Sequence, residues 1–355
     1  MANARELHPP SATFHLRPIF LAGPTAVGKS AIALALADKI GGEIITVDSM
    51  QVYRGLDIGT AKPTAAERQR VPHHLLDICD LNEAFDAAQF VRHAKTAVQE
   101  IQSRERTPIF CGGTGLYFKA LLEGLGEAPA TDSALRAELE ATPLENLLTE
   151  LRERDPVTFG KIDRQNPRRV VRAIEVIRLT GKKFSEQRAA WKAASQNEDG
   201  GSKVEDGKRS EQPSSILHPP SSHFYCLIRP TEDLHRRINL RVDEMFRLGL
   251  VDETRELLKH GLAENKFALQ AIGYRQVGEH LRGEHTLAET IELVKIRTRQ
   301  FAKRQLTWFR RHGNCAWIEL LPGETVEETL GKLMSGACGQ GVLGSGKMEN
   351  TPLDG

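Results

Sequence analysis

The sequence predicts an α/β protein whose parallel sheet carries helices on both faces, and three observations support this fold class. Short apolar runs typical of buried strands alternate with longer segments whose apolar residues recur at helical spacing. A glycine-rich loop lies between the first such strand and the first helix. The composition is that of an ordinary globular chain, with 40% apolar and 27% charged residues among 355. In such a fold, ligands bind at the carboxyl ends of the strands.

The predicted elements follow one another at short intervals. Alanine and leucine dominate the segment after the glycine-rich loop, which is typical of a helix, and Gly41 is suited to end it. Asp86 is suited to the N-cap of a further helix, because the apolar residues behind it recur at helical spacing. In order, we expect a strand over 19–23, a helix over 30–40, a strand over 43–49, a helix over 86–106, a strand over 107–113 and a helix over 114–125.

The character of the chain changes near residue 128, where charged helical segments replace the alternation of strands and helices. Farther on, a stretch rich in Ser, Gly, Pro and charge has too little apolar surface to offset the entropy of ordering it. A strand resumes at 223–230, and the remainder is mostly helical. We therefore predict a core formed by 18–127 and 223–325, a helical insertion domain over 128–191, a disordered linker over 192–222, a disordered N-terminus over 1–17 and a flexible tail over 326–355.

Composition and charge exclude some classes of protein. No apolar run approaches the roughly 18–20 residues that a membrane helix needs, and the N-terminus lacks the apolar segment of a secretory signal. The five cysteines are scattered and form no CxxC pair, which indicates reduced thiols. A net charge of +1 leaves a polyanionic partner open, because basic patches can exist within a balanced total. We expect a cytoplasmic protein with no membrane partner, and we expect it to act as a monomer.

The segment GPTAVGKS fits the phosphate-loop pattern GxxxxGK(S/T) between a predicted strand and a predicted helix. Glycine lets the backbone approach an anion, and the loop N–H groups lie at a helix N-terminus. Lys29 is expected to contact the terminal phosphates and Ser30 to bind Mg²⁺. The pattern predicts a P-loop NTPase-like fold that binds a di- or triphosphate, but it does not specify the reaction. The predicted phosphate site consists of Gly23, Pro24, Thr25, Ala26, Val27, Gly28, Lys29 and Ser30.

Asp48 is the acid most suitably placed for chemistry. Enzymes that hydrolyse ATP or GTP usually carry an aspartate at the end of another strand. Here the strand over 107–113 ends in glycines, and the acid follows the second strand instead. A lone aspartate there is often a turn former, yet the carboxyl ends of parallel strands lie at one edge, beside the loop. A small-molecule kinase would also use such an acid, so the loop and Asp48 leave two functions open.

Six longer segments narrow the choice, and together they resemble the bacterial tRNA dimethylallyltransferase (tRNA isopentenyltransferase) family. The resemblance covers about 19–309 except for 192–222. It implies that the loop holds the pyrophosphate of dimethylallyl diphosphate and that Mg²⁺ is the cofactor. It further implies transfer of the dimethylallyl group to N6 of the adenine 3′ of the anticodon, in tRNAs that read codons beginning with U. The segments are DSMQVYRGLDIGTAKP, VPHHLLDI, CGGTGLYFKALLEGL, NPRRVVRAIEV, ALQAIGYRQ and TRQFAKRQLTWFRR.

The same resemblance implies roles for individual residues. Asp48 corresponds to the general base, and Thr25 to a loop hydroxyl that contacts the diphosphate. An arginine in LHRRINLR would neutralise the leaving group, with Arg237 favoured over Arg241. Basic residues on a helix of the insertion and on a helix near the C-terminus are expected to contact tRNA phosphates. The implied tRNA-binding residues are Asp48, Ser49, Met50, Gln51, Thr114, Arg136, Arg168, Arg169, Val170, Val171, Arg172, Arg299 and Lys303.

Other interpretations of the chain make distinct predictions. His73 and His74 are adjacent and have no third ligand near in sequence, so we expect a hydrogen-bonding structural role for them rather than a metal site. A small-molecule kinase on the same core would consume ATP and have no use for the arginine-rich helices. A non-catalytic RNA-binding protein with a relic phosphate loop would bind tRNA without turnover.

Overall fold

The structure is a computed structural model that describes residues 17–124, 129, 132–186, 223–265, 267–312 and 315–335. It divides into two compact units. Met1–Lys119 and Ile216–Gly355 form the first unit, and Ala120–Ser215 form the second. The predicted disordered linker, 192–222, lies outside the described residues, as does the predicted disordered N-terminus apart from Arg17.

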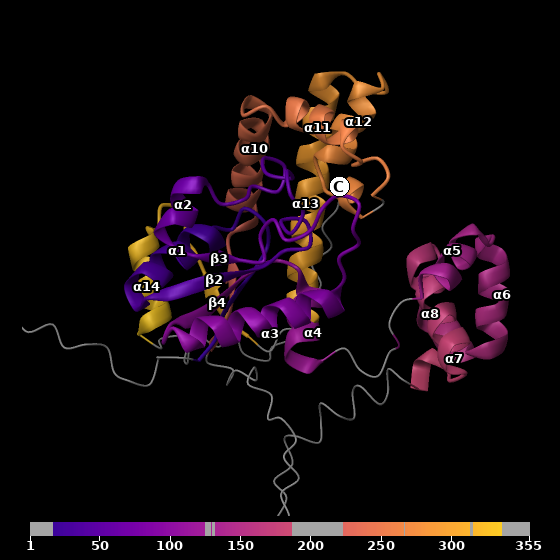
Figure 1. Cartoon of the computed structure of the whole chain (residues 1–355). Helices are drawn as coiled ribbons and strands as arrows, with labels where there is room; N and C mark the ends of the chain where they lie inside the picture. The colour runs from indigo at the N-terminus through magenta and orange to yellow at the C-terminus, as the bar shows by residue number, and fades with distance from the viewer. Residues whose placement is uncertain are drawn as a thin grey trace, which may run out of the picture. The chain divides into compact units, whose positions relative to one another are not determined.

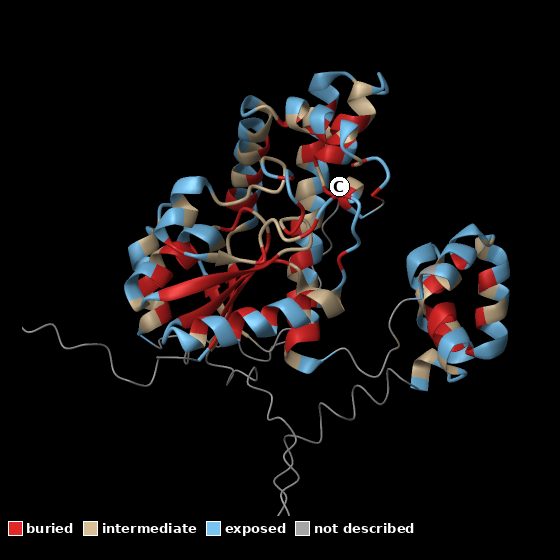
Figure 2. Cartoon of the chain, in the orientation of Figure 1, coloured by how far each residue is buried: buried red, intermediate tan, exposed pale blue. Residues whose placement is uncertain are grey.

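A parallel sheet forms the centre of the first unit (Figure 1). Among the described residues it has six strands in the order β3-β2-β4-β1-β5-β6. Every residue of β1, β2 and β4 is buried, because helices cover both faces (Figure 2). The predicted parallel sheet flanked by helices is therefore confirmed. The strands are β1 (Ile19–Ala22), β2 (Gly42–Val47), β3 (His73–His74), β4 (Thr107–Gly112), β5 (Phe224–Ile228) and β6 (Ala316–Glu319).

The helices of the first unit begin and end at side chains suited to those positions. α1 ends at Gly41, whose φ of 67° is accessible to glycine at little cost. α3 begins at Asp86, which forms a capping box with Gln89. The elements are α1 (Lys29–Ile40), α2 (Ala65–Arg70), α3 (Ala87–Ser103), α4 (Gly115–Glu123), α10 (Thr231–Arg247), α11 (Leu250–Lys259), the 3₁₀ turn η2 (Ala268–Gln270), α12 (Tyr274–Leu281), α13 (Leu287–His312) and α14 (Val326–Met334).

The C-terminal part of the first unit differs from the sequence prediction at the expected tail and contains one strand that was not predicted. The stretch before that tail is mostly helical, as predicted, but Ala316–Glu319 form β6, which pairs with β5. The expected flexible tail, 326–355, begins with a helix, α14, whose Leu330 and Leu333 are buried in the core against α1. Leu330 and Leu333 lie four and seven positions after Val326, which is the spacing of one helix face. The polar residues around them give the stretch the composition of a tail. Residues 336–355 lie outside the described part of the chain.

The second unit has its own small core. Its central helix, α8, is amphipathic, and Val170 and Ile174 are fully buried against Leu147 and Leu151 of α6. The described part of the predicted insertion, 129 and 132–186, contains helices and no strand. The elements are α5 (Ser133–Ala141), α6 (Leu144–Arg154), α7 (Pro156–Lys161) and α8 (Pro167–Thr180).

Candidate active site

The predicted phosphate loop joins β1 to α1, and its conformation depends on two glycines. Gly23 has a φ of 144°, and a Cβ atom there would lie 2.6 Å from the carbonyl oxygen of Leu227 on β5. Gly28 has a φ of 115° and forms the N-cap of α1. Both backbone conformations favour glycine. The loop is thus packed against the sheet at the N-terminus of α1, where the helix dipole and unpaired N–H groups attract an anion.

Lys29 is held over this loop. Its Nζ donates hydrogen bonds to the carbonyl oxygens of Gly23 at 3.0 Å and Pro24 at 2.7 Å. Burial lowers the pKa of Lys29 from 10.5 to about 8, and nearby Arg241 acts in the same direction, while Asp48 opposes it. A bound diphosphate would supply negative charge that favours the ammonium form.

The lowered pKa of Lys29 predicts that diphosphate binding depends on pH. Below about pH 8 the side chain is already charged, whereas above it a proton must be taken up on binding. The dissociation constant for Mg²⁺–pyrophosphate should therefore rise by up to about tenfold per pH unit above that value, as linkage requires. Calorimetric titrations between about pH 7 and pH 9.5 measure this slope. In Lys29→Arg, which stays charged over this range, the slope should vanish. Equal slopes in the parent and the arginine variant would contradict the assignment.

Arginines that follow β5 or belong to α10 lie beside the loop. Arg237 donates from Nε to the carbonyl oxygen of Ala26 at 2.9 Å, and Arg229 donates from Nε to that of Val27 at 2.8 Å. A Cβ atom on Gly28 would lie within 4 Å of both guanidinium groups. Arg241 follows Arg237 by about one helical turn, and burial lowers its pKa while the charge of Asp48 opposes that shift. These cations surround the place where the loop would hold a diphosphate.

Sequence reasoning missed Arg229. It directly follows β5, at the same edge of the sheet as the phosphate loop, and it pairs with Asp233 at 2.9 Å. The available signal was its position after a strand that ends beside the loop, since ligand-binding side chains of parallel sheets cluster there. That strand could be assigned from the sequence, but its neighbours in the sheet could not.

Asp48 follows β2 at the same edge of the sheet. Its Oδ1 accepts hydrogen bonds from the N–H groups of Met50 at 2.8 Å and Gln51 at 3.3 Å. Within the described part of the chain, its Oδ2 accepts no hydrogen bond. The turn-forming and catalytic interpretations are therefore compatible, because one oxygen holds the turn while the other remains available to a substrate. The phosphate loop follows β1, and only β4 separates β1 from β2 in the parallel sheet, so Asp48 and the loop share one edge.

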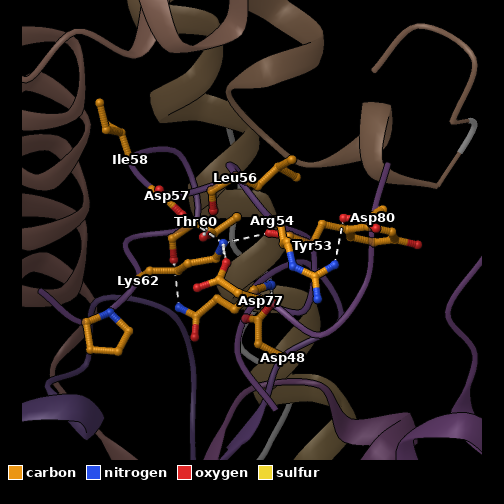
Figure 3. A network of polar contacts seen from close by, with 12 residues as sticks. Asp48, Tyr53, Arg54, Leu56, Asp57, Ile58, Thr60, Lys62, Asp77 and Asp80 are labelled. Carbon is orange, nitrogen blue, oxygen red and sulfur yellow. Dashed lines mark hydrogen bonds and ion pairs between the residues drawn. The ribbon is translucent and has the colours of Figure 1, made fainter. Parts of the chain in front are cut away.

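A polar network fixes the segment that follows Asp48 (Figure 3). The side chain of Lys62 is only 1% exposed, and its Nζ contacts the carbonyl oxygen of Tyr53 at 2.6 Å, Asp57 at 2.8 Å and Asp77. Although burial acts to raise the pKa of Asp77, hydrogen bonds from Lys62 and Arg68 lower it. Asp77 is thus held as a carboxylate, and the buried lysine joins parts of the segment that are distant in sequence.

The amide of Gln51 and the carboxylate of Glu253 hold the same segment at two further points. Gln51 Nε2 donates to the carbonyl oxygen of Thr60 at 2.9 Å. Glu253 on α11 accepts from the Ile58 N–H at 2.9 Å and from the hydroxyl of Tyr274 on α12 at 2.5 Å. The residues implied to contact tRNA next to Asp48 therefore lie on a loop that hydrogen bonds to α11 and α12 support.

Thr114 lies near Asp48 because β2 and β4 are adjacent. Its N–H donates to the carbonyl oxygen of Val47 at 3.3 Å, and Val47 immediately precedes Asp48. A Cβ atom on Gly112 would lie 2.0 Å from the same carbonyl oxygen, so only glycine permits this close approach. The structure thus brings Thr25, Lys29, Asp48 and Thr114 together at one edge of the sheet.

The implied tRNA-binding residues of α8 and α5 belong to the second unit. Arg172 pairs with Glu175 at 2.6 Å, and Arg136 lies 3.5 Å from the same fully buried carboxylate. Arg168 and Arg169 are exposed at the start of α8. Val170 and Val171 are 0% and 4% exposed and form part of the core, so their side chains do not lie on the surface of this unit. The helical period turns these two consecutive positions toward the core although basic residues flank them.

The basic residues of α13 do not all lie on one exposed face of the helix. Arg299 is half-buried and donates from Nη1 to Asn239 on α10 at 2.6 Å. Lys295, one turn earlier, pairs with Asp243 of the same helix α10 at 2.8 Å. Lys303 is exposed. Of the two α13 residues implied to bind tRNA, Lys303 is therefore the more accessible, and Arg299 also helps hold α13 against α10.

His73 and His74 have the hydrogen bonds expected of structural residues. His73 Nδ1 lies 2.8 Å from the Val71 carbonyl oxygen, and His74 Nε2 lies 2.7 Å from Glu43. Over the described ranges, no group of three His, Cys, Asp or Glu side chains is arranged to hold a metal ion. None of the helices that the structure describes is long and apolar enough to cross a membrane.

The glycine-rich loop between β1 and α1, within a parallel sheet flanked by helices, places the protein among the P-loop NTPase-like α/β proteins. In this class the loop binds a phosphate chain at the N-terminus of the first helix. The model of the IPP transferase family matches residues 51–312. The chain belongs to this family, which confirms the resemblance seen in the sequence.

Known proteins of the family resemble the chain over most of its length. tRNA dimethylallyltransferase 1 of Trichlorobacter lovleyi is 44% identical over 306 residues, which cover 85% of this chain and 93% of the relative. tRNA dimethylallyltransferase of Geobacter metallireducens is 43% identical over 312 residues, covering 87% and 94%. The solved structure of a tRNA isopentenylpyrophosphate transferase from Bacillus halodurans has a TM-score of 0.60 and 36% identity, covering 91% of this chain and 98% of that chain. A eukaryotic dimethylallyltransferase solved acting on tRNA has a TM-score of 0.66 and 29% identity, over 85% and 74%.

Proposed function

We propose that the protein transfers a dimethylallyl group from dimethylallyl diphosphate to N6 of the adenine 3′ of the anticodon in tRNA, releasing pyrophosphate. The observation that carries the proposal is the position of Asp48. One of its oxygens forms the turn after β2, and the other remains available beside a cationic phosphate loop. A small-molecule kinase could also use such an acid, but membership of the IPP transferase family does not favour that alternative.

In the proposed reaction, residues of the site take up the proton that is released and neutralise the charge on the leaving group. The lone pair of the adenine N6 is delocalised into the ring, so the amine becomes a better nucleophile as it loses a proton. In our proposal a new bond forms between N6 and C1 of the dimethylallyl group while the bond from C1 to the diphosphate oxygen breaks. The N6 proton passes to Asp48. Lys29 and Arg237 neutralise the charge that develops on the leaving pyrophosphate.

Mg²⁺ fits the oxygen donors at the loop. Ser30 is exposed at the first turn of α1, where its hydroxyl would hold the ion together with oxygens of the substrate diphosphate. Mg²⁺ commonly binds through few protein ligands and substrate phosphates. When bound, it would add positive charge to the diphosphate. A tRNA substrate also fits the cytoplasmic location that we expect from the scattered cysteines.

The substrate requirements test this function. Release of pyrophosphate should require both dimethylallyl diphosphate and unmodified tRNA, and ATP should not replace the prenyl donor. A phosphate assay coupled to pyrophosphatase follows the reaction. ATP consumption with a small-molecule acceptor would support the kinase, and tRNA binding without pyrophosphate release would support a non-catalytic RNA-binding protein.

Removing basic residues from α13 should weaken tRNA binding. In Arg299→Ala/Lys303→Ala, the log–log slope of tRNA affinity against salt concentration should become shallower by somewhat under one unit for each phosphate that the variant no longer neutralises. The Michaelis constant for dimethylallyl diphosphate should barely change. The matched control Lys39→Ala/Lys95→Ala removes the same charge from exposed positions on α1 and α3. An equal change of slope in both double variants would show that α13 is not part of the tRNA interface.

A further inference from the structure

α13 packs directly against the glycine-rich turn after β4. A Cβ atom on Gly113 would lie 2.2 Å from Nε2 of Gln305, and one on Gly115 would lie 2.3 Å from the ring of Trp308. A Cβ atom at either position would displace the Gln305 amide or the Trp308 ring, so the two glycines leave room for these side chains of α13. Gln305 itself is 7% exposed, which is unusual for a glutamine.

The amide of Gln305 joins two turns of the active site. Its Oε1 accepts a hydrogen bond from the N–H of Thr25 at 2.8 Å, and its Nε2 donates to the carbonyl oxygen of Gly113 at 3.0 Å. Thr25 lies in the phosphate loop after β1, and Gly113 follows β4. A primary amide is suited to this task because it donates and accepts within one planar group. The hydrogen bond to Thr25 fixes α13 to the phosphate loop, although Thr25 and Gln305 are 280 residues apart in the sequence.

The bond to Thr25 has a consequence for the loop. The N–H groups of a phosphate loop normally point at the anion, but this one is directed to Gln305. Thr25, which is half-buried, therefore meets a diphosphate through its hydroxyl rather than through its N–H. The orientation of that hydroxyl depends on a main chain that Gln305 holds.

We propose that Gln305 is a positioning residue for the diphosphate loop. It holds the main chain of Thr25 against the turn after β4, so that the loop is preorganised for a diphosphate before the substrate binds. Preorganisation of this kind reduces the cost of ordering a site on binding. The inference rests on the proposed function in one respect, because it takes the ligand of the phosphate loop to be a diphosphate.

The test compares Gln305→Met with Gln300→Met. Methionine has nearly the length of glutamine but can neither donate nor accept as the amide does. Gln300 lies on the same helix, is exposed, and contacts only Arg297, at 3.3 Å, among the interactions of the described residues. Calorimetry with Mg²⁺ and inorganic pyrophosphate should show binding about 5- to 100-fold weaker in Gln305→Met, because the Thr25 N–H and the buried carbonyl oxygen of Gly113 each lose a partner. The Gln300→Met variant should bind like the parent.

Kinetic measurements separate positioning from a general loss of stability. In Gln305→Met the Michaelis constant for dimethylallyl diphosphate should rise by a similar factor, while tRNA affinity should change less than about twofold, since phosphate contacts carry it. If this variant does not fold, Gln305→Asn serves instead. It keeps both polar groups but is one bond too short to reach both partners, and it should weaken pyrophosphate binding by a smaller factor.

The outcomes distinguish the inference from the proposed function. Pyrophosphate binding equal to that of the parent, in whichever variant folds, would overturn the role of Gln305 whether or not the protein prenylates tRNA. A parent protein that binds pyrophosphate but transfers no prenyl group would contradict only the function. A parent that does not bind pyrophosphate would overturn both.

Discussion

Replacing Asp48 by asparagine is expected to slow prenyl transfer by about 10²–10⁴-fold, the usual contribution of general base catalysis. Asparagine keeps an Oδ1 atom that accepts the Met50 and Gln51 N–H groups, so the turn after β2 should survive. Its amide cannot take a proton from adenine N6 at neutral pH. The loss should therefore appear in the single-turnover rate, while the dissociation constants of tRNA and of dimethylallyl diphosphate should change by far less.

Asp80→Asn provides the matched control. Asp80 forms an exposed ion pair with Arg54 at 2.6 Å in the same region (Figure 3). Such surface pairs contribute little to stability, so this variant should prenylate tRNA at close to the parent rate. If Asp48→Asn also transfers the group at close to the parent rate, Asp48 only positions the substrate and is not the base.

Replacing Lys29 by methionine is expected to lower kcat/KM for dimethylallyl diphosphate by about 10²–10³-fold, the effect of removing one preorganised group that stabilises a developing anion. Methionine fills a similar volume but lacks the charge that would meet the leaving pyrophosphate. The affinity for Mg²⁺–pyrophosphate should fall as well, because the charge acts on the bound product. Steady-state kinetics and calorimetry measure the two effects.

Lys39→Met is the control for the same helix. Lys39 is exposed in the last turn of α1, whereas Lys29 begins that helix. The control should keep the kinetics of the parent. A Lys29→Met variant within a few-fold of the parent would show that the loop binds its ligand by N–H groups alone.

The sequence predicts those parts of the fold and site that depend on local pattern. The phosphate loop has a fixed spacing between Gly23 and Ser30, and the strands before and after it are short apolar runs. Asp48 could be placed beside the loop because carboxyl ends of parallel strands share an edge. α14 escapes prediction although its apolar spacing is regular, since the polar residues around that spacing are typical of a tail.

The remaining site residues depend on contacts between distant parts of the chain. Arg229 reaches the loop across 202 residues and Gln305 across 280. The helical period places Gln305 on the face of α13 that carries the buried Ala302 and Phe309, but it does not reveal that the amide bonds to Thr25 and Gly113. Val170 shows that a position inside a basic segment can still lie on the buried face of its helix.

The mass of tRNA after incubation with the protein tests the central claim most directly. Unmodified tRNA is incubated with the protein, dimethylallyl diphosphate and Mg²⁺, then digested with a nuclease and analysed by mass spectrometry. We expect the fragment that contains the adenine 3′ of the anticodon to gain the mass of one dimethylallyl group, with one pyrophosphate released for each group transferred. Unchanged mass of that fragment, with a parent protein that is folded and binds tRNA, would contradict the proposed prenyl transfer.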